Sequence, residues 1–563
     1  MPRGSTILFA LGMVIASFSV AFADGTTLPA APSWWSHDGD EAASSYGNVV
    51  SSAGDVNGDG YDDVIVGAPD WNGDGSKIGR AFVYLGSAAG LAATPHVVYE
   101  GALDNEPSFG RSVSRAGDVN GDGYDDVIVG EGGTVGDGSK GGAAKVYLGS
   151  ASGLTAGDAD WTVIGDHAGD FFGISLSGAG DVNGDGYDDV MIGASAYSKG
   201  QGNEGAAFVY FGSKAGLSSI PDWSDEPDAE DARMGSVLRS VGDVNDDGYD
   251  DIIVGAPDYS SSGNDEDKHK GMARVYYGSE TGPSADADWT YVGGSAYLSF
   301  ASSVAGAGDV NGDGYDDVIV GSHLYEEEYP NEGAAFVFLG SKDGLSAEAD
   351  WSDRSGVALG HFGVSVAPLG DVNDDGYDDV VIGATGTGVP RISVYLGSAD
   401  GLSTDADWTL DEMPGMENLG LSVAGAGDVN GDGWDDLLAG DSGFGVSDET
   451  TEHGAVFLFL AGQSTVTTTT AGTTTTTTTS VPTTSSTTTT TVPDGDDDDD
   501  MDDDTDDDAA DDDAADDDAA DDDAVDDDVD DDSPTPVAQG DDDEDAAPGV
   551  RGEDTSDGDG CGC

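Results

Sequence analysis

The stretch Asp55–Gly67, which reads DVNGDGYDDVIVG, alternates oxygen-bearing side chains through a glycine-rich loop and then continues into an apolar, β-branched segment. Six further copies follow at spacings of 57 to 66 residues, and they begin at Asp118, Asp181, Asp243, Asp309, Asp371 and Asp428. No unrelated globular sequence lies between the copies. This repeat predicts a closed architecture, in which each copy contributes a metal-binding loop that leads into a strand.

The first loop indicates which atoms would hold the metal. Its oxygen donors occupy the first, third, fifth, seventh and ninth positions, the seventh through its backbone carbonyl: Asp55, Asn57, Asp59, Tyr61 and Asp63. Carboxylate, amide and carbonyl oxygens are the ligands that a hard cation such as calcium selects. Gly58 and Gly60 allow the backbone to curl around the ion, and the converging carboxylates would repel one another without it. The loop is therefore predicted to bind calcium.

The same five positions are filled in every other copy. They are Asp118, Asn120, Asp122, Tyr124 and Asp126; Asp181, Asn183, Asp185, Tyr187 and Asp189; Asp243, Asn245, Asp247, Tyr249 and Asp251; Asp309, Asn311, Asp313, Tyr315 and Asp317; Asp371, Asn373, Asp375, Tyr377 and Asp379; Asp428, Asn430, Asp432, Trp434 and Asp436. Seven intact copies predict about seven Ca2+ sites, and they argue against acidic surface turns without metal.

Other calcium loops begin in a similar way, but the residues after the ninth position exclude them. EF-hand and dockerin loops need an acidic ligand at the twelfth position and a helix after it. The twelfth residue here is Val66, within an apolar run of strand character. Glycine-rich β-helices repeat every nine residues, a period that this chain lacks.

Each repeat divides into four short segments of strand character. In order, they are a small-residue strand such as Phe109–Val113, the apolar strand after the loop such as Val127–Gly130, an aromatic and β-branched strand such as Ala207–Ser213, and a tryptophan segment such as Asp160–Ile164. No stretch shows a convincing helical period. Seven such units predict an all-β fold, a seven-bladed β-propeller of four-stranded blades over residues 24–462.

The ends of the repeat region predict how the ring closes. After the seventh loop a third strand runs from Ala455 to Leu460, and a threonine tract follows in place of a fourth strand. A spare tryptophan segment, Pro32–Trp35, precedes the first blade. We predict that this segment supplies the missing outer strand of the last blade.

The Phe172-Gly173 pair, the Gly67-Ala68-Pro69 phrase and the acidic loops resemble the FG-GAP repeats of the integrin α-subunit propeller, over residues 33–462. The resemblance implies that each loop joins the first two strands of a blade and binds calcium through the residues named above. Integrin propellers usually carry the loop in only some blades, whereas all seven have it here. The Phe-Gly pair is replaced in three blades by Met234-Gly235, Phe300-Ala301 and Leu419-Gly420, which puts the local packing there in question.

Blade symmetry places the calcium loops on one face and the variable connections after the second strands on the other, where recognition of a protein or glycan ligand is expected. The fourth residue after the strand-ending glycine is aromatic in five blades: Trp71, Tyr197, Tyr259, Tyr325 and Phe444. If the blades are equivalent, these side chains form a broken ring near the central channel, and the resemblance implies that the ring binds a Lys or Arg of a partner. The alternative is that they only pack between adjacent loops.

The charge and the N-terminus indicate where the protein works. It has 113 acidic and 18 basic side chains, a formal net charge of -95, which disfavours nucleic acid and anionic lipid as partners. Arg3, an apolar run from Ile7 to Phe22 and the Ala21-Phe22-Ala23 site form the plan of a cleavable signal peptide, 1–23. The run is shorter than a membrane anchor requires, and no later stretch could span a bilayer. A secreted or cell-surface protein of bacterial type is predicted.

Two low-complexity segments follow the propeller. The Thr-rich linker 463–493 is predicted to be an extended, O-glycosylated stalk, and the Asp-rich tail 494–563 to be disordered. The tail is interpreted as a solvated spacer or, alternatively, as a weak collective calcium binder. It ends Gly560-Cys561-Gly562-Cys563, which resembles part of bacterial surface-sorting tails. Thiol attachment to the surface, a terminal disulfide and a metal-binding pair all remain open.

Catalysis finds little support in the sequence. The 7 histidines are scattered, HExxH and GxSxG motifs are missing, and no cysteine falls within the repeats. Acid pairs lie in symmetric loops, whereas a general acid–base pair is normally a singular feature. The sequence predicts a non-catalytic adhesion or ligand-binding module. The alternative is a structural cell-coat or matrix protein assembled through calcium, and an enzyme-associated propeller ranks third.

Overall fold

The computed structural model describes most of the repeat region. It covers residues 34–38, 44–72, 78–101, 108–135, 140–260, 269–294, 298–386, 388–389, 391–411, 416, 418–444, 453–461, 465–470 and 473–478. Every regular element in these ranges is a strand, which confirms the all-β class. None of the described residues forms a helix that could cross a membrane. The predicted signal peptide, the Asp-rich tail and the two cysteines lie outside the described residues.

Seven four-stranded antiparallel sheets form the blades. The first three comprise β2 (Val49–Gly54), β3 (Asp63–Ala68), β4 (Arg80–Tyr84) and β5 (Val97–Glu100); β6 (Phe109–Gly117), β7 (Asp126–Val135), β8 (Lys140–Tyr147) and β9 (Trp161–Gly165); β10 (Phe172–Gly180), β11 (Asp189–Ala194), β12 (Ala206–Tyr210) and β13 (Trp223–Asp225). The next two comprise β14 (Val237–Gly242), β15 (Asp251–Ala256), β16 (Met272–Tyr276) and β17 (Trp289–Val292); β18 (Ser303–Gly308), β19 (Asp317–Ser322), β20 (Ala334–Phe338) and β21 (Trp351–Arg354).

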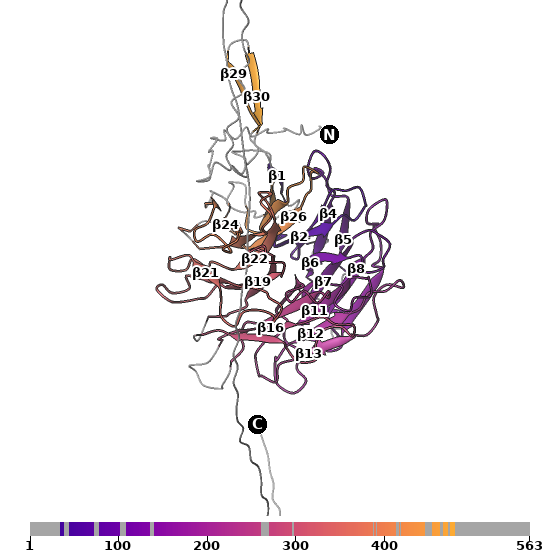
Figure 1. Ribbon diagram of the computed structural model, residues 1–563. Coiled ribbons are helices and arrows are strands. Elements are labelled where there is room, and N and C mark those ends of the chain that lie inside the picture. Colours follow the sequence, from indigo (N-terminus) through magenta and orange to yellow (C-terminus); the bar gives the residue numbers. More distant parts are fainter. Residues whose placement is uncertain are drawn as a thin grey trace, which may run out of the picture. The chain divides into compact units, whose positions relative to one another are not determined.

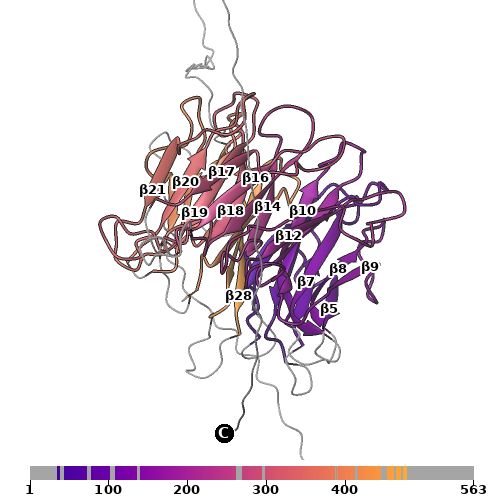
Figure 2. The same cartoon turned by 90° about the horizontal axis from the view of Figure 1, so that it is seen from below.

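The sixth blade comprises β22 (Ser365–Gly370), β23 (Asp379–Gly383), β24 (Ile392–Tyr395) and β25 (Trp408–Leu410), and the seventh β26 (Ser422–Gly427), β27 (Asp436–Asp441), β28 (Ala455–Phe459) and β1 (Trp34–Asp38). Figures 1 and 2 show the blades following one another in chain order around a common centre. The first strand of each blade contacts the first strand of the next, and β26 contacts β2 to complete the circle. The predicted seven-bladed propeller is confirmed.

The strand β1 closes the ring as predicted. It pairs antiparallel with β28, from Trp34 opposite Phe459 to Asp38 opposite Ala455, and so becomes the outer strand of the last blade. The ring of His37 also lies 5.5 Å from the ring of Tyr46 at the start of the first blade. The two ends of the propeller sequence are therefore joined within one sheet.

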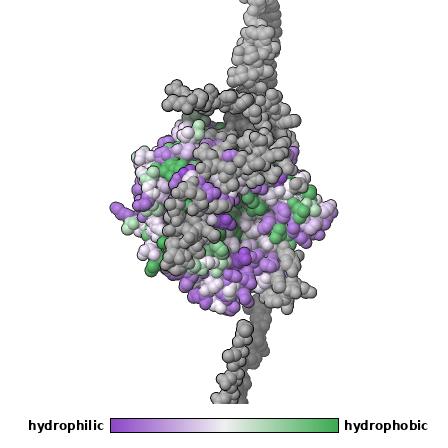
Figure 3. Space-filling model, turned by 180° about the vertical axis from the view of Figure 1, so that it is seen from behind, coloured by the Kyte–Doolittle hydropathy of each residue, from purple (hydrophilic) through white to green (hydrophobic). Residues whose placement is uncertain are grey.

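The hydrophobic core lies between the blades. On the described part of the surface in Figure 3, by contrast, hydrophobic residues are interspersed with hydrophilic ones. The second strands are mostly apolar and are buried along their length, as in β3, because both of their faces are covered by neighbouring blades. At the seam, for example, buried Val64 and Tyr84 of the first blade pack against Leu438 and Val456 of the seventh. A single blade cannot bury its apolar faces without its two neighbours. The stability of each blade therefore depends on the complete ring.

The glycines of the FG-GAP pattern are explained by a close approach between blades. Gly67 ends β3, and a Cβ at that position would lie 2.1 Å from the carbonyl oxygen of Gly110, the glycine of the next blade's Phe-Gly pair. Gly110 itself has a φ of +79°. In the three blades where the pair differs, Met234, Phe300 and Leu419 are buried. The substitutions therefore keep the packing that the sequence put in question.

The tryptophans of the outer strands link neighbouring blades. In four blades the indole Nε1 donates a hydrogen bond to a serine carbonyl in the following blade: Trp161 to Ser218 at 3.0 Å, Trp223 to Ser284 at 2.9 Å, Trp289 to Ser346 at 2.8 Å and Trp351 to Ser403 at 2.9 Å. These serines lie in the connections between third and fourth strands, on the same face as the acidic loops. These tryptophans therefore connect the outer strands of adjacent blades.

Part of the Thr-rich linker differs from the predicted extended stalk. The strands β29 (Thr465–Thr470) and β30 (Thr473–Thr478) pair antiparallel in a two-stranded hairpin. Threonine is β-branched and favours the extended backbone of a strand, which accounts for pairing in a tract whose only apolar residue within the two strands is Val466. The linker beyond residue 478 lies outside the described residues.

Candidate metal centres

Each acidic loop joins the first and second strands of its blade and is shaped by its first aspartate. In the first loop the Asp55 carboxylate accepts hydrogen bonds from the backbone N–H groups of Asp59 at 3.0 Å and Gly60 at 2.7 Å. The carboxylate of Asp59 in turn accepts from the N–H of Tyr61 at 3.2 Å. The same bonds recur in the other loops, for example from Asp375 and Gly376 to Asp371. The strand predicted to follow each loop is confirmed.

The ninth-position aspartate lies beneath the loop. Asp63 is fully buried, and its two carboxylate oxygens accept hydrogen bonds from the N–H groups of Val56 at 3.0 Å and Gly86 at 2.8 Å. Burial, together with the nearby charges of Asp55 and Asp59, raises its pKa to about 8. The pKa is raised to about 8, again chiefly by burial, for Asp126, Asp189, Asp251, Asp317, Asp379 and Asp436. Each loop thus holds a buried carboxylate whose ionised form a bound cation would stabilise.

The third-position asparagine completes the donor set. Buried amide atoms of Asn57, Asn120 and Asn373 have no hydrogen-bond partner. An asparagine amide can present either its oxygen or its nitrogen after a half-turn of the side chain, so these positions can offer an oxygen to a cation. No three Asp, Glu, His or Cys side chains converge on one metal position among the described residues. A calcium ion would therefore also need the third-position amide oxygen and the seventh-position backbone carbonyl as ligands. Calcium is a hard cation that takes about six to eight oxygen ligands, so this donor set fits it.

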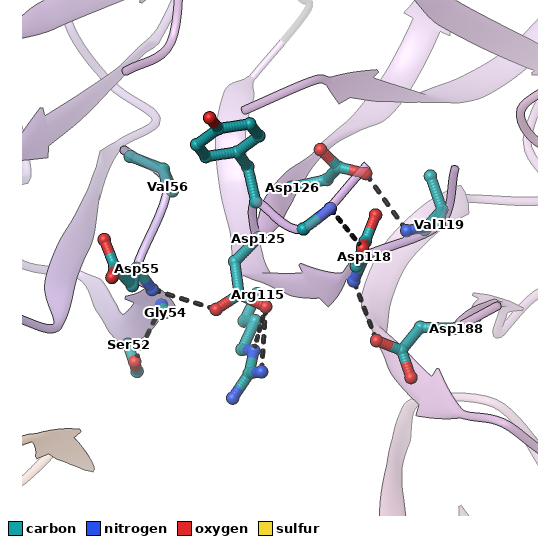
Figure 4. A network of polar contacts seen from close by, with 12 residues as sticks. Ser52, Gly54, Asp55, Val56, Arg115, Asp118, Val119, Asp125, Asp126 and Asp188 are labelled. Atoms are coloured by element: carbon teal, nitrogen blue, oxygen red, sulfur yellow. Dashed lines mark hydrogen bonds and ion pairs between the residues drawn. The ribbon is translucent and has the colours of Figure 1, made fainter. Parts of the chain in front are cut away.

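Sequence reasoning missed the eighth position of the loop, which points to the neighbouring blade. Figure 4 shows Asp125 reaching the start of the preceding loop, where its Oδ2 accepts a hydrogen bond from the N–H of Asp55 at 2.9 Å. Its other oxygen accepts from Nε of Arg115 at 2.9 Å. The signal was present, because all seven copies carry aspartate here: Asp62, Asp125, Asp188, Asp250, Asp316, Asp378 and Asp435.

On the opposite face, the aromatic side chains pack onto the third strands of their own blades. The guanidinium carbon of Arg80 lies 3.2 Å from the ring centroid of Trp71, so a cation of the chain itself already covers this ring. Edge-to-face ring contacts join Tyr197 to Phe208, Tyr325 to Phe336 and Phe444 to Phe457. Tyr259 packs against the core between the third and fourth blades. These contacts favour the packing alternative, and recognition of a partner's cation by these five residues stays a prediction.

The central channel is lined by residues of the first strands. It encloses about 600 Å³, and none of the five aromatic residues is among its lining residues. Serines and the arginines Arg115 and Arg239 line the side formed by the first four blades, whereas Ala305, Ala367 and Ala424 line the other side. The five aromatic residues therefore do not line this cavity, and the ring that the sequence predicts near the channel stays a prediction.

The histidines form one contact that the sequence did not indicate. Nδ1 of His323 lies 2.8 Å from Oγ of Ser302, and the rings of His323 and His361 are 6.0 Å apart. Burial and the neighbouring His361 lower the pKa of His323. No carboxylate orients His323 among the described contacts, so the third member that activates a serine–histidine pair is missing from this part of the chain.

Three comparisons with known proteins bear on this fold. The FG-GAP repeat model matches residues 46–84, 109–148, 172–210, 240–272, 300–338 and 362–397. Integrin alpha pat-2 of Caenorhabditis elegans is 30% identical over 322 residues, which is 52% of this chain and 25% of that protein. Integrin alpha-IIb of Mus musculus is 36% identical over 151 residues, 25% of this chain and 14% of that protein. The chain thus spans at most a quarter of the length of these relatives.

Among solved structures, the exotype rhamnogalacturonan lyase YesX aligns with 79% of this chain and 75% of its own, at 12% identity and a TM-score of 0.37. A likeness of this size carries no argument about function. The repeats, the relatives and the closed ring of four-stranded blades agree with one another. The chain therefore carries an integrin-α-like FG-GAP β-propeller.

Proposed function

We propose that this protein is exported and that its propeller is a calcium-stabilised, non-catalytic adhesion module, which binds a protein or glycan on the face opposite the acidic loops. The similarity to proteins named as integrin alpha subunits supports an adhesion-type role. The observation that carries the proposal is that the two faces of the propeller present different kinds of loop. Seven oxygen-donor loops lie on one face, and pre-ordered loops of differing chemistry lie on the other.

Calcium binding is supported by the buried charge of each loop. Asp63 and its six equivalents are fully buried carboxylates, and an ionised carboxylate is costly to bury without a compensating cation. The other donors predicted for each loop are oxygens of Asp, Asn and a backbone carbonyl group, which select calcium over softer metals. When bound, calcium would supply the positive charge that offsets the repulsion between these carboxylates.

Two loops of the opposite face are ordered by buried glutamates. The Glu204 carboxylate accepts hydrogen bonds from the N–H groups of Lys199 at 2.6 Å, Gly200 at 2.9 Å and Gln201 at 3.1 Å. In the fifth blade, Oε1 of Glu332 accepts at 2.9 Å from each of the N–H groups of Glu327 and Glu328. Loops held in one conformation lose less entropy when they bind a partner. These two loops are therefore suited to recognition.

The tips of these two loops differ in chemistry. The tip in the fifth blade exposes Glu326, Glu328 and Tyr329, the last with 40% of its surface accessible. The third-blade tip instead carries Lys199 and Gln201. An acidic tip with an exposed tyrosine suits a Lys- or Arg-bearing partner.

The calcium part of the proposal is tested by thermal unfolding of the secreted protein with calcium and with chelator. Calcium should raise the melting temperature by about ten degrees or more if the loops fill together, because each ion stabilises only the folded state. An unchanged melting temperature would count against calcium. Sequencing the N-terminus of the secreted protein should find it beginning at Asp24.

The recognition part is tested with a matched pair of surface variants in a screen of basic peptides and glycans. Tyr329→Ala removes an exposed side chain from the acidic tip, and Ile220→Ala removes one that is 70% exposed in a connection on the calcium-loop face. Binding should be saturable and should weaken only with Tyr329→Ala. Calcium-dependent self-association without saturable binding would favour the structural coat protein instead.

A further inference from the structure

The start of each acidic loop is held by a residue of the next blade. At the junction between the first and second blades, Oδ2 of Asp125 accepts the N–H of Asp55 at 2.9 Å, and the N–H of Asp125 donates to the carbonyl oxygen of Asp55 at 3.3 Å (Figure 4). The two bonds fix the backbone of Asp55 from both sides. Asp55 supplies the carboxylate around which the rest of its loop is folded.

The arrangement repeats around the ring. The N–H of the first loop residue donates to the eighth-position carboxylate of the next blade in five further junctions: Asp118 to Asp188 at 2.7 Å, Asp181 to Asp250 at 2.7 Å, Asp243 to Asp316 at 2.8 Å, Asp309 to Asp378 at 2.9 Å and Asp428 to Asp62 at 2.9 Å. At the remaining junction, Oδ2 of Asp435 would lie 2.0 Å from a Cβ on Gly370, so this carboxylate reaches the same place. The last of the five bonds crosses the seam where the chain's two ends meet.

The neighbouring blade also fills the space beside the loop. A Cβ on Gly54, which precedes Asp55, would lie 2.2 Å from Oδ2 of Asp125. A Cβ on Gly58, inside the loop, would lie 2.7 Å from the ring of Tyr124. Gly54 and Gly58 have φ values of +68° and +69°, which glycine adopts without steric cost. Each loop therefore matches the surface presented by the next blade.

We propose that the eighth-position aspartate of each blade is the positioning residue for the calcium site of the preceding blade, so that the seven sites are linked around the ring. This inference rests on the proposed calcium binding. The eighth residue is not among the ligands predicted for its own loop. Its carboxylate fixes the first ligand residue of the neighbouring loop and adds negative charge beside it. Groups that orient metal ligands in this way typically change metal affinity by about 10-fold to 100-fold.

The seventh blade offers a way to observe the sites at one junction. Its loop carries Trp434 at the seventh position, where the other six loops carry tyrosine. Terbium(III) binds oxygen-rich calcium sites, and tryptophan transfers excitation energy to it only at short range. Tryptophan-excited terbium luminescence therefore reports the loops beside Trp434, which are its own seventh loop and the sixth loop against which its ring packs. Trp434→Tyr should abolish most of this signal.

The deciding variant lies in the first blade. Asp62→Ala removes the acceptor that holds Asp428 of the seventh loop, 366 residues away in sequence. We expect the terbium concentration at half-maximal luminescence from Trp434 to rise by about 10-fold or more. Asp62→Asn keeps an oxygen acceptor without the charge, and it should give a smaller increase. This second variant also keeps the test open if Asp62→Ala does not fold.

The matched control is Asp250→Ala, which removes the equivalent carboxylate at a distant junction, where it holds Asp181 of the third loop. We expect this variant to affect folding to a similar extent but to leave the luminescence midpoint at Trp434 unchanged. An equal shift in both variants, or no shift with either Asp62 variant, would overturn the positioning role. Absence of terbium and calcium binding by the unaltered protein would instead overturn the proposed calcium function, and the inference with it.

Discussion

The backbone N–H of Asp428 in the seventh blade donates a hydrogen bond across 2.9 Å to the carboxylate of Asp62 in the first blade, and the N–H of Asp62 donates to the carbonyl oxygen of Asp428 at 3.2 Å. These bonds close the inner circle of the propeller on the face of the acidic loops. The strand β1 closes its outer edge by pairing with β28. The ring is therefore fastened twice between its ends, once near the channel and once at the rim.

The outer closure should contribute measurable stability. Deleting residues 24–38 removes β1 and leaves the edge of β28 unpaired, whereas deleting 24–33 keeps the strand. We expect the longer deletion to lower the melting temperature by about 5 °C or more, since an exposed strand edge loses its backbone hydrogen bonds and packing. The shorter deletion serves as the control. Equal melting temperatures for the two truncated proteins would show that β1 does not stabilise the ring.

The glycine contact between blades predicts a large effect from one added methyl group. Gly67→Ala would place its Cβ 2.1 Å from a backbone oxygen of Gly110, which a flexible side chain cannot relieve. We expect a loss of about 1–3 kcal/mol in the free energy of unfolding, as for other overpacked cores. Gly294→Ala is the control, because this exposed position has no neighbouring atom within 4 Å of the new Cβ. The free energy of unfolding of both variants can be measured by denaturant unfolding. Similar losses in the two variants would contradict the prediction.

The indole hydrogen bond between blades can be isolated by comparing two tryptophans. Trp223→Phe removes the donor to Ser284 but keeps an aromatic ring against Tyr276. The expected loss is about 1 kcal/mol, the usual net contribution of such a bond. Trp408 makes a similar edge-to-face contact with Phe459 but has no such indole bond among the described contacts. Trp408→Phe should therefore lower the free energy of unfolding by less than Trp223→Phe. If chemical unfolding gave equal losses for the two variants, the loss would come from the smaller ring and not from the hydrogen bond.

The buried ninth-position aspartates predict how stability depends on pH without calcium. Their pKa is raised to about 8 in the folded protein, as for Asp63 and Asp126, whereas unfolded aspartates titrate near about pH 3.9. The folded state then binds more protons than the unfolded state between about pH 4 and pH 8, so stability falls as pH rises through this range. Thermal unfolding in chelator should show this fall.

Calcium should reverse that trend, because the ion replaces the proton as the partner of each carboxylate. In saturating calcium, stability should rise between about pH 5 and pH 8. If the melting temperature in chelator rose with pH as well, the raised pKa values of these aspartates would be contradicted.

How much of the structure could be predicted from the sequence depends on how far apart in the sequence the interacting residues lie. The acidic loops, the strands after them and the tryptophan strands are local patterns, and their sevenfold repetition predicted the blade number. The outer strand at the seam was also predictable, since the last blade lacked a fourth segment and the N-terminus carried a spare one, which pairs from Trp34 to Asp38. The hairpin at Thr465–Thr478 was not, because threonine tracts lack an apolar pattern.

The side-chain contacts between separate strands and between blades could not be predicted from the sequence. Arg80 covers Trp71, and Asp125 holds Asp55, through side chains that meet only once the strands and blades have packed. Aspartate repeated at the eighth position signals that the residue matters, but its partner is 70 residues away. The sequence by itself determined the blade and its strands and predicted the donor atoms of its loop, because these depend on local chemistry repeated seven times. Only the tertiary structure decided that each loop is completed by its neighbour, because that depends on how closely adjacent blades approach around a closed ring.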